Sequence, residues 1–255
     1  MNPIDATLHG PEVAWFALSP ILVLLGGGLA LLVVAALTPR WPKGLYAFFS
    51  AATAGAAIVL SMVLWDDVTD EGPKFLVGGA IALDRFALMA TIVISVAVLL
   101  ASLITDDYLR RESLDGPEVY GLYLMAAIGG IVMASANDLI VMFLGLEVLS
   151  IALYVLAASH RRRIESQESG IKYFVLGAFA SAFFLYGVAL VYGSTGSTNF
   201  TTILDNVSAN VPVHRNDALV LAGVALLIVG LAFKVAAVPF HFWTPDVYQL
   251  SLIHI

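Results

Sequence analysis

The sequence of 255 residues lacks cysteine entirely and is poor in charge, with Asp, Glu, Lys and Arg making up only 12% of it. Without cysteine there is no disulfide, no thiolate-held iron–sulfur cluster and no cysteine nucleophile. The five histidines are scattered, with no spacing typical of metal ligands. We therefore predict neither redox chemistry nor a metal or cofactor site in this chain.

Basic residues are also missing from the start of the chain, where residues 1–17 contain Asp5 and Glu12 but no lysine or arginine. A secretory signal peptide begins with a positively charged region, so none is predicted. The formal net charge of −7 says little about partners, because most acidic residues fall in short loops rather than in one patch. We expect no nucleic-acid partner.

Apolar residues, in contrast, make up 60% of the chain, and the mean hydropathy is +0.92. Apolar runs of about 20 residues, enough to cross roughly 30 Å of hydrocarbon as a helix, recur along the sequence and leave no room for a soluble domain. The predicted fold class is an all-α, polytopic membrane helix bundle of about seven transmembrane helices. The predicted spans are 18–38, 45–65, 81–104, 119–136, 139–158, 171–193 and 217–238.

Local signals support these boundaries and give an orientation. Thr38-Pro39 ends the first span, and Asn137-Asp138 offers an N-cap for the fifth, which predicts a tight hairpin of the fourth and fifth spans. Lysine and arginine favour cytoplasmic loops. The main basic residues fall in alternate loops, all on one side: Arg40, Lys43, Arg110, Arg111, Arg161, Arg162 and Arg163. We predict that this side is the cytoplasm and that the N-terminus lies outside.

Glu147 stands near the centre of the apolar run VMFLGLEVLSIALYVL, residues 141–156. It lies roughly 13 Å into its span, which is beyond the reach of snorkelling. An ionised carboxylate at that depth needs a partner, a proton or a wet cavity. Ser150 and Tyr154 share its helical face, so a polar stripe faces inward. We interpret Glu147 as a functional residue, with a structural hydrogen bond as the alternative.

Lys234, in GLAFKVAAVPF, is the second ionisable residue inside an apolar span. In a continuous helix from residue 217 it would lie about 25 Å along, near the cytoplasmic edge, where snorkelling would suffice. Pro239 lacks an N–H, however, and breaks or kinks a helix just after the lysine. A break at depth is tolerated only against protein or water. We predict a discontinuous seventh helix, broken between about Phe233 and Phe240, with Lys234 at mid-depth.

Lys172 and His241 are weaker candidates. Lys172 begins the sixth span, where a snorkelling lysine is ordinary, so an interfacial and a functional role are equally open. His241 follows the predicted break in the sequence. We expect it to lie on the next face of the chain and to support the relay from there. A buried glutamate with buried lysines indicates a proton relay, because close approach of the two favours both charged forms and their separation then controls lysine protonation.

Two long motifs, SANDLIVMFLGLEVLSIALYVLA and FKVAAVPFHFWTPDVYQ, closely resemble subunit N of proton-pumping NADH-quinone oxidoreductase, respiratory complex I. The resemblance covers nearly the whole chain and favours subunit N over its two antiporter-like sister subunits. It implies an antiporter-like subunit of the membrane arm. In it, Glu147, Lys172 and Lys234 match the family's relay residues on the fifth, sixth and broken seventh helices.

The same resemblance implies a setting for the chain. The implied function is proton translocation coupled to quinone reduction, and the implied location is the bacterial cytoplasmic (inner) membrane. The flavin and iron–sulfur clusters of the enzyme belong to other subunits. The implied partners are other membrane-arm subunits, the lipid bilayer and, indirectly, quinone.

One departure from the family stands at the end of the sequence. After WTPDVYQ the family continues with a Gly-Ala-Pro-Thr-Pro type turn and more helices, whereas this sequence reads LSLIHI. We interpret residues 250–255 as an artefactual tail and residues 1–249 as a truncated antiporter-like membrane domain, which is not expected to pump alone. The alternatives are a subunit of a multi-subunit cation/proton antiporter and a non-catalytic scaffold. A substrate permease would need a wider polar cavity.

Overall fold

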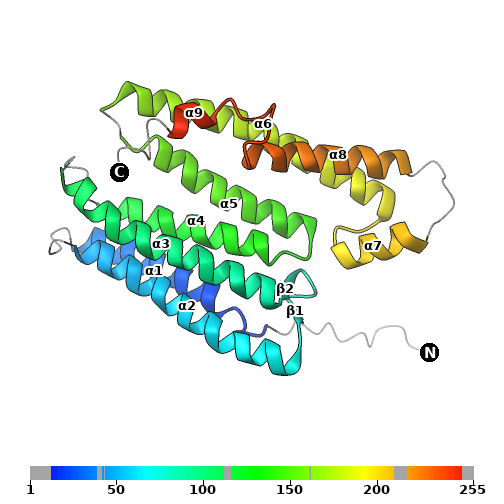
Figure 1. Cartoon of the computed structure of the whole chain (residues 1–255), viewed down its shortest axis with the longest axis horizontal. Coiled ribbons are helices and arrows are strands. Elements are labelled where there is room, and N and C mark those ends of the chain that lie inside the picture. The colour runs from blue at the N-terminus through cyan, green and yellow to red at the C-terminus, as the bar shows by residue number, and fades with distance from the viewer. Residues whose placement is uncertain are drawn as a thin grey trace, which may run out of the picture.

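The computed structural model describes residues 13–38, 42, 44–111, 116–160, 162–209 and 217–248. Within this part of the chain, long helices run side by side in a bundle, and a small β-hairpin lies at one end (Figure 1). The helices are α1 (Ser19–Leu37), α2 (Leu45–Glu71), α3 (Arg85–Arg111), α4 (Pro117–Ala134), α5 (Leu139–Ala157), α6 (Ile164–Thr195), α7 (Phe200–Ala209), α8 (Asp217–Lys234) and α9 (Thr244–Val247). The antiparallel hairpin pairs β1 (Lys74–Leu76) with β2 (Ile81–Leu83).

Six of the described helices, α1 to α6, are long and apolar enough to cross a membrane, and α8 is a shorter apolar helix. The predicted all-α, polytopic membrane bundle is therefore confirmed, with the β-hairpin as an addition that the sequence did not predict. Several helices extend past the predicted spans: α2 continues to Glu71, α3 to Arg111, and α6 already begins at Ile164. Hydropathy marks only the part of a helix that lies in hydrocarbon, so charged helix ends escape it.

The seventh apolar helix, α8, is broken where the sequence predicts a break. It ends at Lys234, and the chain turns through residues 235–243 before α9. Ala236 has a φ of +53°, and Pro239 has no N–H, so neither residue continues the helix. The helix therefore stops short of the predicted limit at residue 238. Figure 1 shows α8 ending part-way along α6, with α9 beside the N-terminal part of α6.

Two glycines allow the backbones of α4 and α5 to approach each other very closely. A methyl group added at Gly129 would lie 2.7 Å from the Gly145 carbonyl oxygen, and one added at Gly145 would lie 2.6 Å from the Met133 nitrogen. Such distances leave no room for a side chain, so the two backbones touch at this glycine crossing. Toward the other end of the hairpin the two helices diverge (Figure 1).

Three loops meet at the end of the bundle that carries the β-hairpin. The Gly79 carbonyl accepts hydrogen bonds from Asn137 Nδ2 at 2.8 Å and from Asn199 Nδ2 at 3.0 Å, and Thr198 Oγ1 donates to Asp138 Oδ2 at 2.7 Å. Asp138 also accepts from a backbone N–H in the first turn of α5, which confirms the predicted N-cap. This loop junction ties α2–α3, α4–α5 and α6–α7 together at one end.

Some predictions fall on residues outside the described ranges. These are the helix-ending Pro39, the basic residues Arg40, Lys43 and Arg161, residues 1–12 of the segment 1–17 for which no signal peptide is predicted, and the proposed tail at 250–255.

Candidate functional site

Lys234, the last residue of α8, directs its ammonium group at two hydroxyl groups. Its Nζ donates to Ser150 Oγ at 2.8 Å and to Tyr173 Oη at 3.0 Å. The same Nζ lies 5.5 Å from the ring centre of Tyr154 and 5.2 Å from that of Tyr173, which is within cation–π range. The C-terminal end of a helix also favours a cation, because its free carbonyl groups carry partial negative charge. The structure thus provides a place for a proton on Lys234.

The Ser150 hydroxyl has a fixed direction. It is buried, with 1% of its surface exposed, and donates its single hydrogen to the Leu146 carbonyl at 2.5 Å. A hydroxyl has one hydrogen and two lone pairs, so the lone pairs of Ser150 are left to face Lys234. Ser150 is therefore an acceptor for the lysine, not a donor to it.

Glu147 lies on α5 one helical turn before Ser150, and it is half-buried. Its carboxylate accepts a hydrogen bond from Ser181 on α6. Among the described residues, no direct ion pair joins Glu147 to Lys234, whose ammonium group hydrogen-bonds to Ser150 and Tyr173 instead. The predicted proton relay between the two stays a prediction, while the polar stripe of Ser150 and Tyr154 does reach Lys234.

Tyr173 is held in place from both sides of the helix break. Its ring stacks on Trp243, with ring centres 4.4 Å apart and planes 13° apart, and the Trp243 Nε1 donates to the Phe233 carbonyl at 3.1 Å. Tyr154 meets the Tyr173 ring edge-on, with centres 4.7 Å apart. Gly177 makes this possible, because a methyl group there would overlap the Tyr154 hydroxyl. The acceptor of Lys234 is thus fixed by an aromatic cluster.

The structure leaves two of the candidate residues apart from Lys234. The Lys172 side chain is 48% exposed, and its Nζ lies 2.8 Å from carboxylate oxygens of both Glu168 and Asp246. His241 stacks on Phe242, with ring centres 5.1 Å apart, and its Nδ1 is buried without a hydrogen-bond partner. Neither residue contacts the Lys234 ammonium.

Sequence reasoning missed Tyr173, Ser181 and Trp243. A signal for the first two was present, since Tyr173, Gly177 and Ser181 follow one another in steps of four residues and so share one face of α6. Trp243 carried no such signal, because its contact with Tyr173 depends on how the chain folds back after the break.

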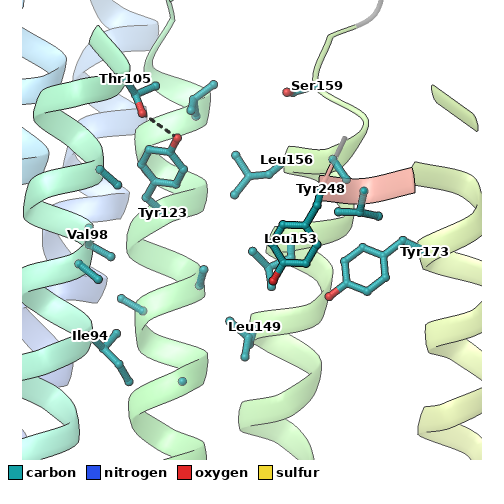
Figure 2. Close-up of a pocket in the computed structure, with 18 of the residues that line it drawn as sticks. Ile94, Val98, Thr105, Tyr123, Leu149, Leu153, Leu156, Ser159, Tyr173 and Tyr248 are labelled. Carbon is teal, nitrogen blue, oxygen red and sulfur yellow. Dashed lines mark hydrogen bonds between the residues drawn. The ribbon is translucent and has the colours of Figure 1, made fainter. Parts of the chain in front are cut away.

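A cavity of about 640 Å³ lies beside this site, where α4 and α5 diverge. Figure 2 shows Val98 and Tyr123 on one side of it and Leu153 of α5 on the other, with Tyr173 and Tyr248 facing in. The lining is mostly apolar and includes neither Glu147 nor Lys234. Tyr173 is the residue that joins the two features, with its ring in the wall of the cavity and its hydroxyl on Lys234.

Comparison with known proteins places these features in a family context. Residues 136–253 match the family described as NADH:quinone oxidoreductase/Mrp antiporter, transmembrane region. NADH-quinone oxidoreductase subunit N of Trichlorobacter lovleyi is 40% identical over 230 residues, which are 90% of this chain and 46% of that protein. Subunit N of Methylobacterium nodulans is 42% identical over 248 residues, 95% of this chain and 49% of that protein. The chain spans about half the length of the curated relatives it matches.

Solved structures show the same architecture. A chain of respiratory complex I from Thermus thermophilus, solved with bound aureothin, is 32% identical with a TM-score of 0.71, over 90% of this chain and 47% of that one. A chain of the membrane-bound sulfane sulfur reductase, an archaeal respiratory membrane complex, is 26% identical with a TM-score of 0.76, over 93% of this chain and 48% of that one. A chain of the Mrp complex from Dietzia sp. is 21% identical with a TM-score of 0.69, which shows a shared fold alone.

Proposed function

Since this chain is a homologue of subunit N of NADH-quinone oxidoreductase and corresponds to its N-terminal portion, we propose that it belongs to the membrane arm of that complex and translocates protons through Glu147 and Lys234. Proton movement is then coupled to quinone reduction elsewhere in the complex. Flavin and iron–sulfur clusters belong to partner subunits, and quinone is met only through the complex. The chain lies in the bacterial inner membrane with its N-terminus outside, against other membrane-arm subunits and the rest of its own subunit.

The observation that carries this proposal is the setting of Lys234. It is an ammonium group at the end of a broken apolar helix, within hydrogen-bond distance of two hydroxyl oxygens. One of them, on Ser150, lies one helical turn after Glu147 on α5. A lysine needed only for anchoring would point to the membrane surface. This one points inward at Ser150 and Tyr173, where a proton can be held or released.

The energies involved fit a transport step. Moving one charge against 100 mV costs about 2.3 kcal/mol. A hydrogen bond to a charged group contributes about 1.5–3 kcal/mol, so making or breaking one or two of them changes the proton affinity of a lysine by a comparable amount. Glu147 lies one helical turn before the lysine's acceptor Ser150, and Ser181 donates a hydrogen bond to the Glu147 carboxylate. A shift of α5 relative to α8 would therefore load or unload Lys234.

The test uses the full-length subunit assembled in the complete complex, in inverted membrane vesicles. Glu147→Gln and Lys234→Ala should lower proton pumping and NADH:quinone reduction together by about tenfold or more, the effect of losing a charged partner. Electron transfer from NADH to a water-soluble acceptor should persist, because it bypasses the membrane arm. Glu147→Asp should retain more activity than Glu147→Gln.

Glu71→Gln is the matched control, since Glu71, the last residue of α2, is an exposed carboxylate whose partner is Lys74 of β1. It should pump normally. Normal pumping by fully assembled Glu147→Gln and Lys234→Ala enzymes would contradict the relay and favour a non-catalytic scaffold.

A second candidate function is a subunit of a multi-subunit cation/proton antiporter, which the match of residues 136–253 to the family described as NADH:quinone oxidoreductase/Mrp antiporter favours. Sodium-dependent proton movement in vesicles that contain no quinone would support it. Strict dependence on NADH and quinone supports the respiratory complex instead.

A further inference from the structure

Lys172 and Asp246 join two segments that are 74 residues apart in the sequence. Lys172 Nζ on α6 lies 2.8 Å from Asp246 Oδ2 on α9. Three residues earlier on α6, Ser169 Oγ donates to the backbone carbonyl of Asp246 at 3.1 Å. These contacts, which we call the clamp, fasten α9 to the first turns of α6, and Figure 1 shows the two elements side by side.

The clamp acts on a segment that also reaches the end of α8. Trp243 directly precedes α9, and its indole N–H binds the Phe233 carbonyl at 3.1 Å while its ring stacks on Tyr173. The chain after the helix break is thus anchored at two points, the clamp and the last turn of α8. Between these points lies the ring of Tyr173, whose hydroxyl accepts from Lys234 at 3.0 Å.

We propose that Lys172 is a positioning residue, whose ion pair with Asp246 holds α9 and Trp243 against α6 and thereby keeps the Tyr173 hydroxyl on Lys234. The inference rests on the proposed function of Lys234. Lys172 does not carry protons in this scheme. Its side chain is 48% exposed and occupied by two carboxylates, and it contacts neither Ser150 nor Lys234.

The first test measures coupled activity in the complete complex. Lys172→Gln and Asp246→Asn should each lower pumping by about two- to fivefold, the range that a partly exposed ion pair supplies. The double variant should be no worse than either single one, because both remove the same contact. Lys172→Arg should retain activity, and the charge exchange Lys172→Glu with Asp246→Lys should regain most of it.

Two controls separate the clamp from a general loss of surface charge. Glu168→Gln removes the other partner of Lys172 on the same helix and should pump normally. Lys74→Gln removes a lysine of similar exposure, 42%, that is paired with Glu71. It should also pump normally.

The second test reads the position of α9 directly and does not depend on pumping. Val247, in α9, is 6% exposed, and the chain has no cysteine of its own. A Val247→Cys reporter should react slowly with a membrane-permeant maleimide, and Lys172→Gln or Asp246→Asn should speed the reaction severalfold. Val68→Cys, which is 4% exposed in α2, should react at the same rate in both backgrounds.

The outcomes distinguish the clamp from the relay. Unchanged Val247→Cys labelling in Lys172→Gln overturns the clamp, even when Lys234→Ala abolishes pumping. Loss of pumping in Lys172→Gln with a fully active Asp246→Asn also overturns it, and would assign Lys172 to the relay itself. Normal pumping in Lys234→Ala overturns the proposed function, while the labelling result still decides the clamp.

Discussion

At the scale of single residues, the surroundings of Lys234 are unusual because they solvate a charge without neutralising it. Ser150 and Tyr173 supply oxygen lone pairs, and two aromatic rings supply electron-rich faces. None of these groups carries a full negative charge. A lysine held in this way gains from protonation but is not locked in the charged state, as it would be in a close ion pair. That is a useful property for a group that has to release its proton.

Removing one of the two acceptors tests this interpretation. Ser150→Ala and Tyr173→Phe should each lower pumping by about tenfold, since a hydrogen bond to a charged group is lost, but less than Lys234→Ala does. Pumping is measured in vesicles and normalised to the amount of assembled complex. Tyr173→Phe keeps the ring that stacks on Trp243, so its effect reports on the hydroxyl.

Ser102→Ala provides the control for these substitutions. Ser102 is equally buried, and its hydroxyl bonds that of Ser50 at 2.9 Å, away from Lys234. It should lower stability slightly and leave pumping per assembled complex unchanged. An equal loss in all three variants would show that buried serine and tyrosine hydroxyls matter here only for folding.

At the scale of elements, the close crossing of α4 and α5 depends on glycine. Gly129→Ala should destabilise the hairpin by about 1–3 kcal/mol, because the new methyl group would overlap the backbone of α5. The melting temperature of the purified complex, or of the subunit in detergent, measures this effect. Gly26→Ala in α1 is the matched control, since nothing lies within 4 Å of the added methyl group. A stable Gly129→Ala variant would mean that the two helices are not in backbone contact.

How far sequence alone predicts these elements differs from one to the next. The break after Lys234 was predictable, because a proline removes a helical hydrogen bond wherever it stands. The hydrogen bond between Lys234 and Ser150 was predictable only in part. Helical spacing puts Ser150 on the same face of α5 as Glu147, but it does not say which residues pack against that face. The β-hairpin and α7 gave no strong signal because both are short. The predicted third span, 81–104, even took in β2 (Ile81–Leu83), whereas α3 begins only at Arg85. The pairing of Lys172 with Asp246 depends on the chain folding back after the break, and no local pattern encodes that.

At the scale of the whole molecule, the orientation in the membrane is open to direct measurement. The basic residues predict that the β-hairpin lies outside and the loop after α5 inside. Val77, between the two strands, is 40% exposed, and Arg162 after α5 is also exposed. A Val77→Cys variant should react with a membrane-impermeant maleimide on whole spheroplasts, whereas Arg162→Cys should react only in inverted vesicles. The opposite pattern would reverse the orientation.

The loop junction has a mechanical consequence for the bundle. Three hairpins are tied together by hydrogen bonds at one end, and α4 and α5 touch at the glycine crossing before they diverge around the 640 Å³ cavity. Because the helices are fastened at this end, a tilt of any one of them produces a displacement that grows with distance from the loop junction. A small tilt of α5 against α4 would barely disturb the loops, would move Ser150 by an intermediate amount, and would carry the far ends of α5 and α6 the furthest. Movement of α5 and α6 would therefore be largest on the side where the clamp fastens α9, away from the side predicted to face outward.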